Sequence, residues 1–214
     1  MGRRSLRKID PALDLSRHLR SLDDLPALLD VAKNLFNHPA PLEIEVGSGK
    51  GLFMATASGE YPQHNFLGIE VVQKYARFAA AKLAKLDRTN AVMIHGDAMR
   101  LFREMLPSGC AVAVHVYFPD PWWKKRHKKR RVMNVDFLRD VVRTLEPNGS
   151  LHFWTDVEEY FITTLELIAA NIELQGPIAV EVNDPETDMD YQTHFERRMR
   201  QHGLDVFRAE FRKE

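Results

Sequence analysis

The sequence predicts an α/β domain with a doubly wound, mostly parallel sheet that carries helices on both faces. Short apolar runs alternate with helical stretches over most of the 214 residues, which is typical of this class. The run "CAVAVHVYF" (110–118) is almost continuously apolar, as expected for a strand at the buried centre of a parallel sheet. No apolar run is long enough to form a membrane-spanning helix.

The alternation begins with "LEIEV" (42–46), which predicts a short strand followed by the Gly-rich turn "GSGKG" (47–51). Residues 52–62 have apolar positions at helical spacing and end at a proline, so we expect a helix there. The run "NFLGIEV" (65–71) predicts the second strand. Residues 73–88 combine strong helix formers with apolar positions at helical spacing, which predicts the second helix.

The rest of the chain continues the pattern and ends in a strand that we expect to be antiparallel to its neighbour. Run length, apolar spacing and turn residues predict each element. In order, these are a strand at 90–97, a helix at 98–106, a strand at 110–118, a helix at 135–145, the turn "EPNG" at 146–149, a strand at 150–155, helices at 157–172 and 193–203, and a strand at 205–213.

Residues 1–38 lie outside this alternation and are expected to be a basic N-terminal arm that leads into a helix. Residues 39–214 contain no repeat, linker or break in composition, so we expect one domain. The single cysteine, Cys110, excludes an internal disulfide, and the N-terminus lacks the apolar core of a signal peptide. We therefore expect a cytoplasmic protein, with no membrane segment and, for lack of metal-ligand spacing, no metal. The oligomeric state cannot be read from the sequence.

The formal net charge is zero, but the charges are strongly segregated. Residues 122–131 carry seven Lys or Arg and no acid, whereas residues 155–191 carry ten Asp or Glu and no Lys or Arg. Local fields rather than net charge attract a polyanion, so the basic run suits contact with phosphates of a nucleic acid. A solvated, mobile loop or a targeting signal is the alternative interpretation.

In a sheet of this class, ligands bind beyond the carboxyl ends of the strands, at the strand-to-helix turns. The first such turn, "EVGSGKG", supplies Glu45, Gly47 and Gly49. It is not a P-loop, because Lys50 is followed by Gly51, and its third glycine comes one residue early for a dinucleotide fingerprint. A tight turn without a ligand is the alternative.

The next two turns also place acids at strand ends. Glu70 follows Gly47 by 23 residues, a distance at which an acid can accept hydrogen bonds from both hydroxyls of a ribose. Asp97 follows the third strand and could cap the next helix. In class I methyltransferases, whose first motif the glycine turn resembles, a residue at this place lies near the adenine amino group. Each acid alone is more simply a solvated strand end or a cap, but the three turns together favour an adenosine ligand.

The fourth turn carries "FPDPWWKKRHKKRR" (118–131). Together with "LEIEVGSGKG", "FLGIEV", "GDA", "WTDVEEY" and "THFERR", which occur in this order over about residues 40–212, it closely resembles the bacterial-type tRNA (guanine-N7)-methyltransferases. The resemblance implies a Rossmann-like sheet of the class I methyltransferases, S-adenosylmethionine as cofactor and tRNA as partner. It also implies methylation of the variable-loop guanine. Trp123 stands at a position that varies in this family.

The resemblance also implies roles for individual residues. Asp120 is expected to be catalytic and to lie at the cofactor and the target base. The expected cofactor-binding residues are Glu45, Gly47, Gly49, Glu70, Asp97 and Asp120. The expected substrate-binding residues are Lys124, Asp156, Thr193 and Glu196. The basic run is expected to supply an RNA-binding loop of Lys125, Arg126, Lys128, Lys129, Arg130 and Arg131.

Several of these residues have a structural alternative. Asp156 could be the N-cap of the helix that follows it, and the pair Thr193 and Glu196 fits a capping box. Trp122 is expected to fill a packing gap beside a proline rather than to stack on a base. At the level of the whole protein, the alternatives are another enzyme with an adenosine cofactor and a non-catalytic RNA-binding module.

Overall fold

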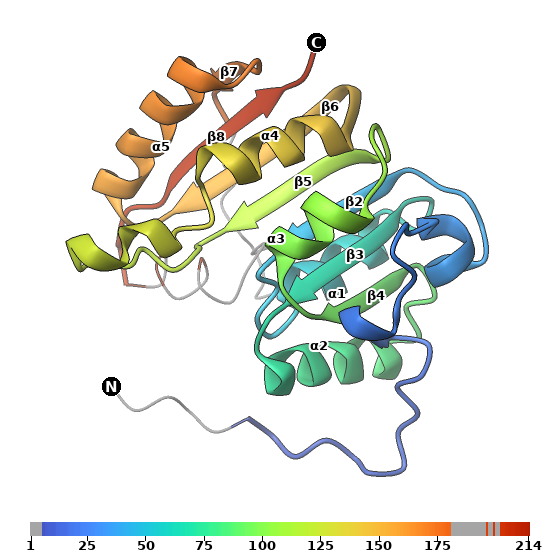
Figure 1. The fold of residues 1–214 in the computed structure, drawn as a ribbon. Coiled ribbons are helices and arrows are strands. Elements are labelled where there is room, and N and C mark those ends of the chain that lie inside the picture. The colour runs from blue at the N-terminus through green and yellow to red at the C-terminus, as the bar shows by residue number, and fades with distance from the viewer. Residues whose placement is uncertain (1–5, 181–195, 197–198, 200–201) are drawn as a thin grey trace.

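The structure is a computed structural model, and it describes residues 6–180, 196, 199 and 202–214. These residues form one mixed sheet with the strand order β1-β4-β3-β2-β5-β6-β8-β7 (Figure 1). The strands are β1 (Leu19–Ser21), β2 (Leu42–Val46), β3 (Asn65–Glu70), β4 (Ala91–His95), β5 (Ala111–Tyr117), β6 (Leu145–Thr155), β7 (Gln175–Ile178) and β8 (Phe207–Arg212).

Five α-helices accompany the sheet in the described residues, together with shorter helical turns. The α-helices are α1 (Leu52–Glu60), α2 (Gln73–Lys85), α3 (Ala98–Arg100), α4 (Val135–Thr144) and α5 (Glu158–Asn171). The shorter turns are η1 (Leu22–Asp24), η2 (Ala32–Phe36), η3 (Leu101–Met105) and η4 (Lys125–Arg130). No described helix has the length and apolar character needed to cross a membrane.

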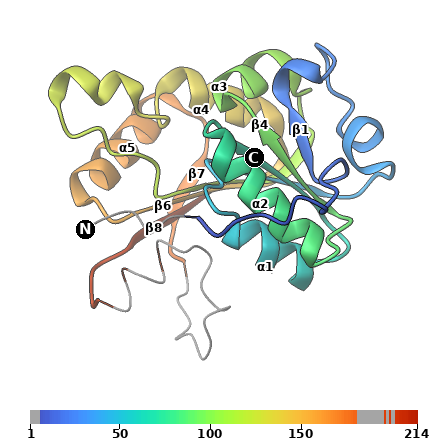
Figure 2. The same cartoon turned by 90° about the horizontal axis from the view of Figure 1, so that it is seen from below.

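The pairing confirms the predicted fold class. Strands β1 to β6 pair in parallel, whereas β8 is antiparallel to β6 and β7 is antiparallel to β8. Helices α1 and α2 cover one face of the sheet, and α4 and α5 cover the other (Figure 2). From β2 the chain adds β3 and β4 on one side, and from β5 it adds β6 on the other side. The strand order therefore reverses between the neighbouring strands β2 and β5. A ligand crevice is expected at this reversal.

Alternation along the strands divides the buried side chains between two cores. On β5, for example, Val114 and Val116 belong to the core under α4 and α5, whereas Tyr117 belongs to the core under α1 and α2. The first core includes Phe137 of α4, which is fully buried. The sheet is therefore held on both faces, and its carboxyl-terminal strand ends are left as the edge on which a site can form.

Four features differ from the sequence expectation. Residues 19–21 form an edge strand beside β4, with Leu19 opposite Met93, although residues 1–38 were expected to be an arm and a helix outside the strand–helix alternation. Leu22 and Leu29 are also buried in the core. Strand β7 was not expected, and residues 146–149 belong to β6 as an irregular part of its start. The boundary at residue 39 stays a prediction, and the helix expected at 193–203 falls largely outside the described residues.

Candidate cofactor and RNA site

The Gly-rich turn after β2 has the left-handed backbone that only glycine adopts without strain. Gly47, Gly49 and Gly51 have φ angles of 76°, 52° and 63°. A Cβ atom on Gly51 would lie 2.6 Å from Cβ of Ala79, so this glycine allows α1 to begin against α2. A Cβ atom on Gly47 would meet nothing within 4 Å, so the turn is open on that side. The turn therefore presents exposed backbone at the point where the strand order reverses.

Glu70, at the end of β3, is tied to this turn through its carboxylate. Its Oε2 atom accepts a hydrogen bond from the N–H of Gly49, and its Oε1 atom accepts one from the N–H of Val72, both at 2.8 Å. A carboxylate offers about four acceptor positions, so two of them are left for a ligand. Glu70 thus holds the turns after β2 and β3 together and retains the capacity to accept from two hydroxyls.

Glu45 is a buried acid with an unsatisfied oxygen. Its Oε2 atom has no hydrogen-bond partner among the described residues, and the whole residue is buried. Burial, reinforced by the nearby carboxylate of Glu70, raises the pKa of Glu45 to about 8. A buried acceptor without a partner carries a free-energy penalty that a cationic or hydrogen-bond-donating ligand would relieve.

Asp97 and Asp156 follow β4 and β6 at the same edge of the sheet. Asp97 is exposed and caps α3, since its Oδ1 atom accepts from the N–H of Met99 at 2.9 Å. Asp156 does not cap α5, because the N-cap position is Val157 and no side chain caps it. The capping alternative is therefore realised for Asp97 and not for Asp156.

The Pro-Asp-Pro turn (119–121) begins one residue after β5, which ends at Tyr117. Phe118 and Trp122, on either side of it, have left-handed φ angles of 49° and 45°, although neither is glycine. Such a conformation costs about 1–2 kcal/mol for each non-glycine residue, so the surrounding structure has to impose it. Asp120 is exposed at the tip of the turn. The backbone on both sides of Asp120 is thus held in an unusual shape, and its carboxylate faces solvent.

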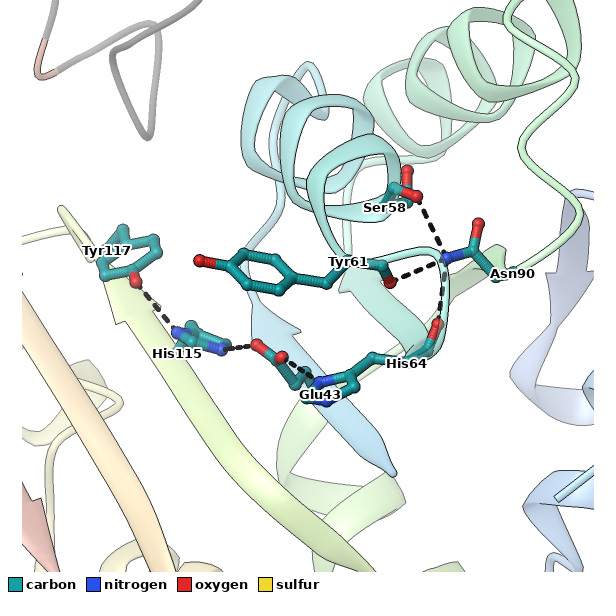
Figure 3. A network of polar contacts seen from close by, with 7 residues as sticks. All are labelled: Glu43, Ser58, Tyr61, His64, Asn90, His115 and Tyr117. Atoms are coloured by element: carbon teal, nitrogen blue, oxygen red, sulfur yellow. Dashed lines mark hydrogen bonds and ion pairs between the residues drawn. The ribbon is translucent and has the colours of Figure 1, made fainter. Parts of the chain in front are cut away.

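A polar network lies within the sheet below this turn, on the face that carries α1 (Figure 3). Glu43 joins two histidines, with Oε1 2.7 Å from Nδ1 of His64 and Oε2 2.8 Å from Nε2 of His115. The Nδ1 atom of His115 lies 2.8 Å from the hydroxyl of Tyr117, the last residue of β5. Burial alone would raise the pKa of Glu43, but the bonds to the two histidines outweigh it and lower that pKa. The network anchors the end of β5 to the sheet interior.

Residues 125–130 of the basic run form the turn η4, and the side chains of the run differ in their exposure to solvent. Arg126, Lys129 and Arg130 are exposed, as expected of RNA-binding residues, and so is Lys124. Arg131 differs from these side chains, because it is buried and hydrogen-bonded to protein groups, which does not suit the RNA contact expected of it. The side chains of Lys125 and Lys128, and the whole of Thr193, lie outside the described part of the chain.

Two tryptophans precede η4. Trp122 packs against its own loop, with the Arg130 guanidinium 5.0 Å from its ring centroid and the His127 ring edge-on to it, as the packing interpretation predicted. Trp123 is 69% exposed. The loop therefore presents one aromatic surface beside its exposed cations.

Comparison with known sequences identifies the family. A family model described as "Putative methyltransferase" matches residues 39–209. A tRNA (guanine-N(7)-)-methyltransferase of Rhodopirellula baltica is 50% identical over 219 residues, which cover 100% of this chain and 80% of that protein. One of Paracidovorax citrulli is 35% identical, over 90% of this chain and 76% of that protein. The chain belongs to the tRNA (guanine-N(7)-)-methyltransferase family.

Solved structures agree with the tRNA (guanine-N(7)-)-methyltransferase family at the level of the fold. The 16S rRNA methyltransferase KamB has a TM-score of 0.64 at 17% identity, over 87% of this chain and 94% of that one. A SAM-dependent methyltransferase from Aquifex aeolicus has a TM-score of 0.57 at 15% identity, over 88% and 92% of the two chains. These structures show the fold alone. Membership of the family shows that the chain is a methyltransferase that uses S-adenosylmethionine, as the sequence predicted.

The residues of this tRNA (guanine-N(7)-)-methyltransferase family member fit that cofactor on their own chemistry. S-adenosylmethionine carries a positively charged sulfonium, an ammonium and a ribose with two hydroxyls. The unsatisfied oxygen of Glu45 suits a cation, the open side of Gly47 leaves room for close approach, and Glu70 has acceptor positions left for the ribose. The assignment of each residue to a part of the cofactor stays a prediction.

Two arginines near the predicted substrate-binding residues were not anticipated as structural residues. Arg208 of β8 donates from Nη2 to Oε1 of Glu196 at 2.9 Å and lies over the ring of Trp154, 4.9 Å from its centroid. Glu196 is therefore buried in an ion pair, and not exposed as a free carboxylate. Arg131 is the second arginine with a structural role that was not anticipated. No pattern in the basic run separates it from its neighbours, except that the buried Met133 follows it closely.

Proposed function

We propose that the protein transfers the methyl group of S-adenosylmethionine to N7 of the variable-loop guanine of tRNA, forming 7-methylguanosine. One observation carries the proposal: the cofactor-fitting turns after β2 and β3 lie on the same sheet edge as the Pro-Asp-Pro turn, which continues into exposed cations. The relatives of Rhodopirellula baltica and Paracidovorax citrulli are tRNA (guanine-N(7)-)-methyltransferases, which supports the same substrate.

The reaction requires little covalent chemistry from the protein. The sulfonium methyl group is already an electrophile, and N7 of guanine has an in-plane lone pair and no proton to remove. No general base is needed, so positioning and charge stabilisation supply the catalysis. Attack by N7 leaves positive charge on the purine, and Asp120 accepts hydrogen bonds from the N1 and N2 donors of the base as that charge develops.

The exposed cations of the loop supply the attraction for RNA. Arg126, Lys129 and Arg130 follow Asp120 by six to ten positions on the same loop, so phosphates bound there bring a nucleotide to the catalytic turn. A small-molecule substrate would not need such a surface, and the spacing of the glycines disfavours NAD. Lys124 and Asp156 are the further substrate contacts that we propose, and a cytoplasmic location stays a prediction.

The test is nucleoside analysis of an unmodified tRNA transcript after incubation with the purified protein and S-adenosylmethionine. We expect about one 7-methylguanosine per tRNA, and none when the variable-loop guanine is replaced by adenine. Full methylation of that second transcript would place the target elsewhere. Methylation of a different base atom, or of none, would remove the proposed function.

A further inference from the structure

Arg131 ends the basic run but is only 8% exposed, whereas Lys129 and Arg130 beside it are exposed. It is one of few buried cations in the described chain, and a buried cation is stable only when its donors are paired. The partners of the Arg131 guanidinium therefore indicate its structural role.

The guanidinium of Arg131 contacts three groups in different directions. Its Nε atom donates to the carbonyl oxygen of Pro121 at 2.7 Å, and its Nη2 atom donates to Oε2 of Glu159, on α5, at 2.9 Å. Its Cζ atom lies over the ring of Tyr160, 4.3 Å from the centroid. The Tyr160 hydroxyl accepts from the N–H of Met133 at 3.3 Å, so this ring is itself fixed. The rigid fork of an arginine suits such a set of contacts, and a lysine cannot reproduce it.

The bond to Pro121 acts on the residue that follows Asp120. Pro119 and Pro121 have no N–H to donate, so the backbone of the Pro-Asp-Pro turn can be held only through its carbonyl oxygens and the single N–H of Asp120. Arg131 donates a hydrogen bond to the carbonyl oxygen of Pro121, and the N–H of Phe118 donates one to the carbonyl oxygen of Trp154 at 2.8 Å. The turn is thus held at both ends, where Phe118 and Trp122 are left-handed.

The same bond closes the basic loop at its base. Residues 122–130 lie between its two partners, which are ten positions apart in the sequence. The loop and the catalytic turn therefore share one anchor, and that anchor is attached to α5 through Glu159 and Tyr160.

We propose that Arg131 is a positioning residue for Asp120 and that it does not bind tRNA phosphate. By fixing Pro121 against α5, it sets the direction of the Asp120 carboxylate beside the cofactor-fitting turns. The inference rests on the proposed function, because Asp120 acts on the target base only in that reaction.

The test compares variants of two adjacent arginines in the full-length protein, with kcat and tRNA KM measured over a range of salt concentrations. Arg131→Ala should lower kcat by about ten- to a hundred-fold, because small misplacements of a catalytic group have effects of that size. Its KM and the salt dependence of KM should stay within about two-fold of wild type. Arg130→Ala, the matched control, should act on KM and flatten its salt dependence.

Arg131→Lys separates charge from geometry. It keeps the positive charge, so a phosphate contact would be largely retained, but it loses the fork and the flat stacking surface. We expect a kcat nearly as low as that of Arg131→Ala. Wild-type behaviour of Arg131→Lys, or a rise in KM without a fall in kcat for Arg131→Ala, would overturn the inference.

Two measurements keep a folding defect distinct from a positioning defect. Thermal unfolding gives the folded fraction at the assay temperature, and a kcat loss that disappears after correction for it would also overturn the inference. If Arg131→Ala does not fold, Glu159→Gln decides, because it weakens the hold on Arg131 without removing it. A fall in kcat with unchanged KM is expected, and an unchanged kcat refutes the role. If the wild type makes no 7-methylguanosine, the proposed function itself fails.

Discussion

The Oε2 atom of Glu70 accepts a hydrogen bond from the backbone N–H of Gly49 at 2.8 Å, and this bond joins the turns after β2 and β3. One carboxylate thereby shapes the glycine turn and remains available to a ligand. Cofactor affinity should therefore depend on Glu70 for two reasons, the geometry of the turn and the contact itself.

Replacing Glu70 by alanine should raise the Kd for S-adenosylmethionine at least about ten-fold, because the loss of a charged acceptor costs roughly 1.5–3 kcal/mol. Isothermal titration calorimetry measures the change. Glu60→Ala, at the exposed end of α1, is the control and should bind as the wild type does. Equal affinity of the Glu70 variant and the wild type would contradict the ribose assignment.

Gly51→Ala should destabilise the fold more than a left-handed backbone alone explains. Its Cβ would lie 2.6 Å from Cβ of Ala79, on a residue with φ of 63°. Gly109 offers a matched control, since its φ is 61° and its added Cβ would meet nothing within 4 Å. We expect losses of about 1–2 kcal/mol for Gly109→Ala and about 1–3 kcal/mol more for Gly51→Ala. Urea unfolding gives both values, and equal losses would show that the contact with Ala79 relaxes without cost.

Cofactor binding should become tighter as the pH rises toward 8. The pKa of Glu45 is raised to about 8, so the unliganded protein keeps this acid protonated at lower pH. A cation bound beside it favours the ionised form, and the proton is released on binding. Between pH 6 and 7.5 the affinity should therefore rise by up to about ten-fold per pH unit, as measured by titration calorimetry. Glu45→Gln should remove this dependence, and a wild-type affinity that does not change with pH would rule out the coupling.

Removing the exposed cations should weaken tRNA binding without affecting the cofactor. The double variant of Lys129→Ala and Arg130→Ala should raise the tRNA KM and reduce the slope of log KM against log salt by about 0.7–0.9 per lost phosphate contact. Lys33→Ala, an exposed lysine outside the basic run, serves as the control. If the slope of the double variant equals that of the control, the loop does not contact phosphate.

The strands that could be predicted from the sequence are those whose apolar pattern matches their burial in the structure. Strands such as β3 and β5 are short apolar runs between turn residues, and Glu70 and Asp120 could be placed at a ligand-binding edge because parallel strands end there. Strand β1 has three residues and no pattern of its own, since its pairing with β4 is decided by tertiary contact. The burial of Arg131 was equally hidden, because it depends on Glu159 and Tyr160 far along the chain.

Strand β1 determines where an N-terminal truncation of this protein can begin. The family match begins at residue 39, and an expression boundary chosen from it would delete β1 together with the buried Leu22. The peptide groups of β4 would then face water along an uncovered edge, which invites pairing between molecules and insoluble material. A truncated protein should therefore begin before His18, because the carbonyl oxygen of His18 accepts a hydrogen bond from the N–H of Met93.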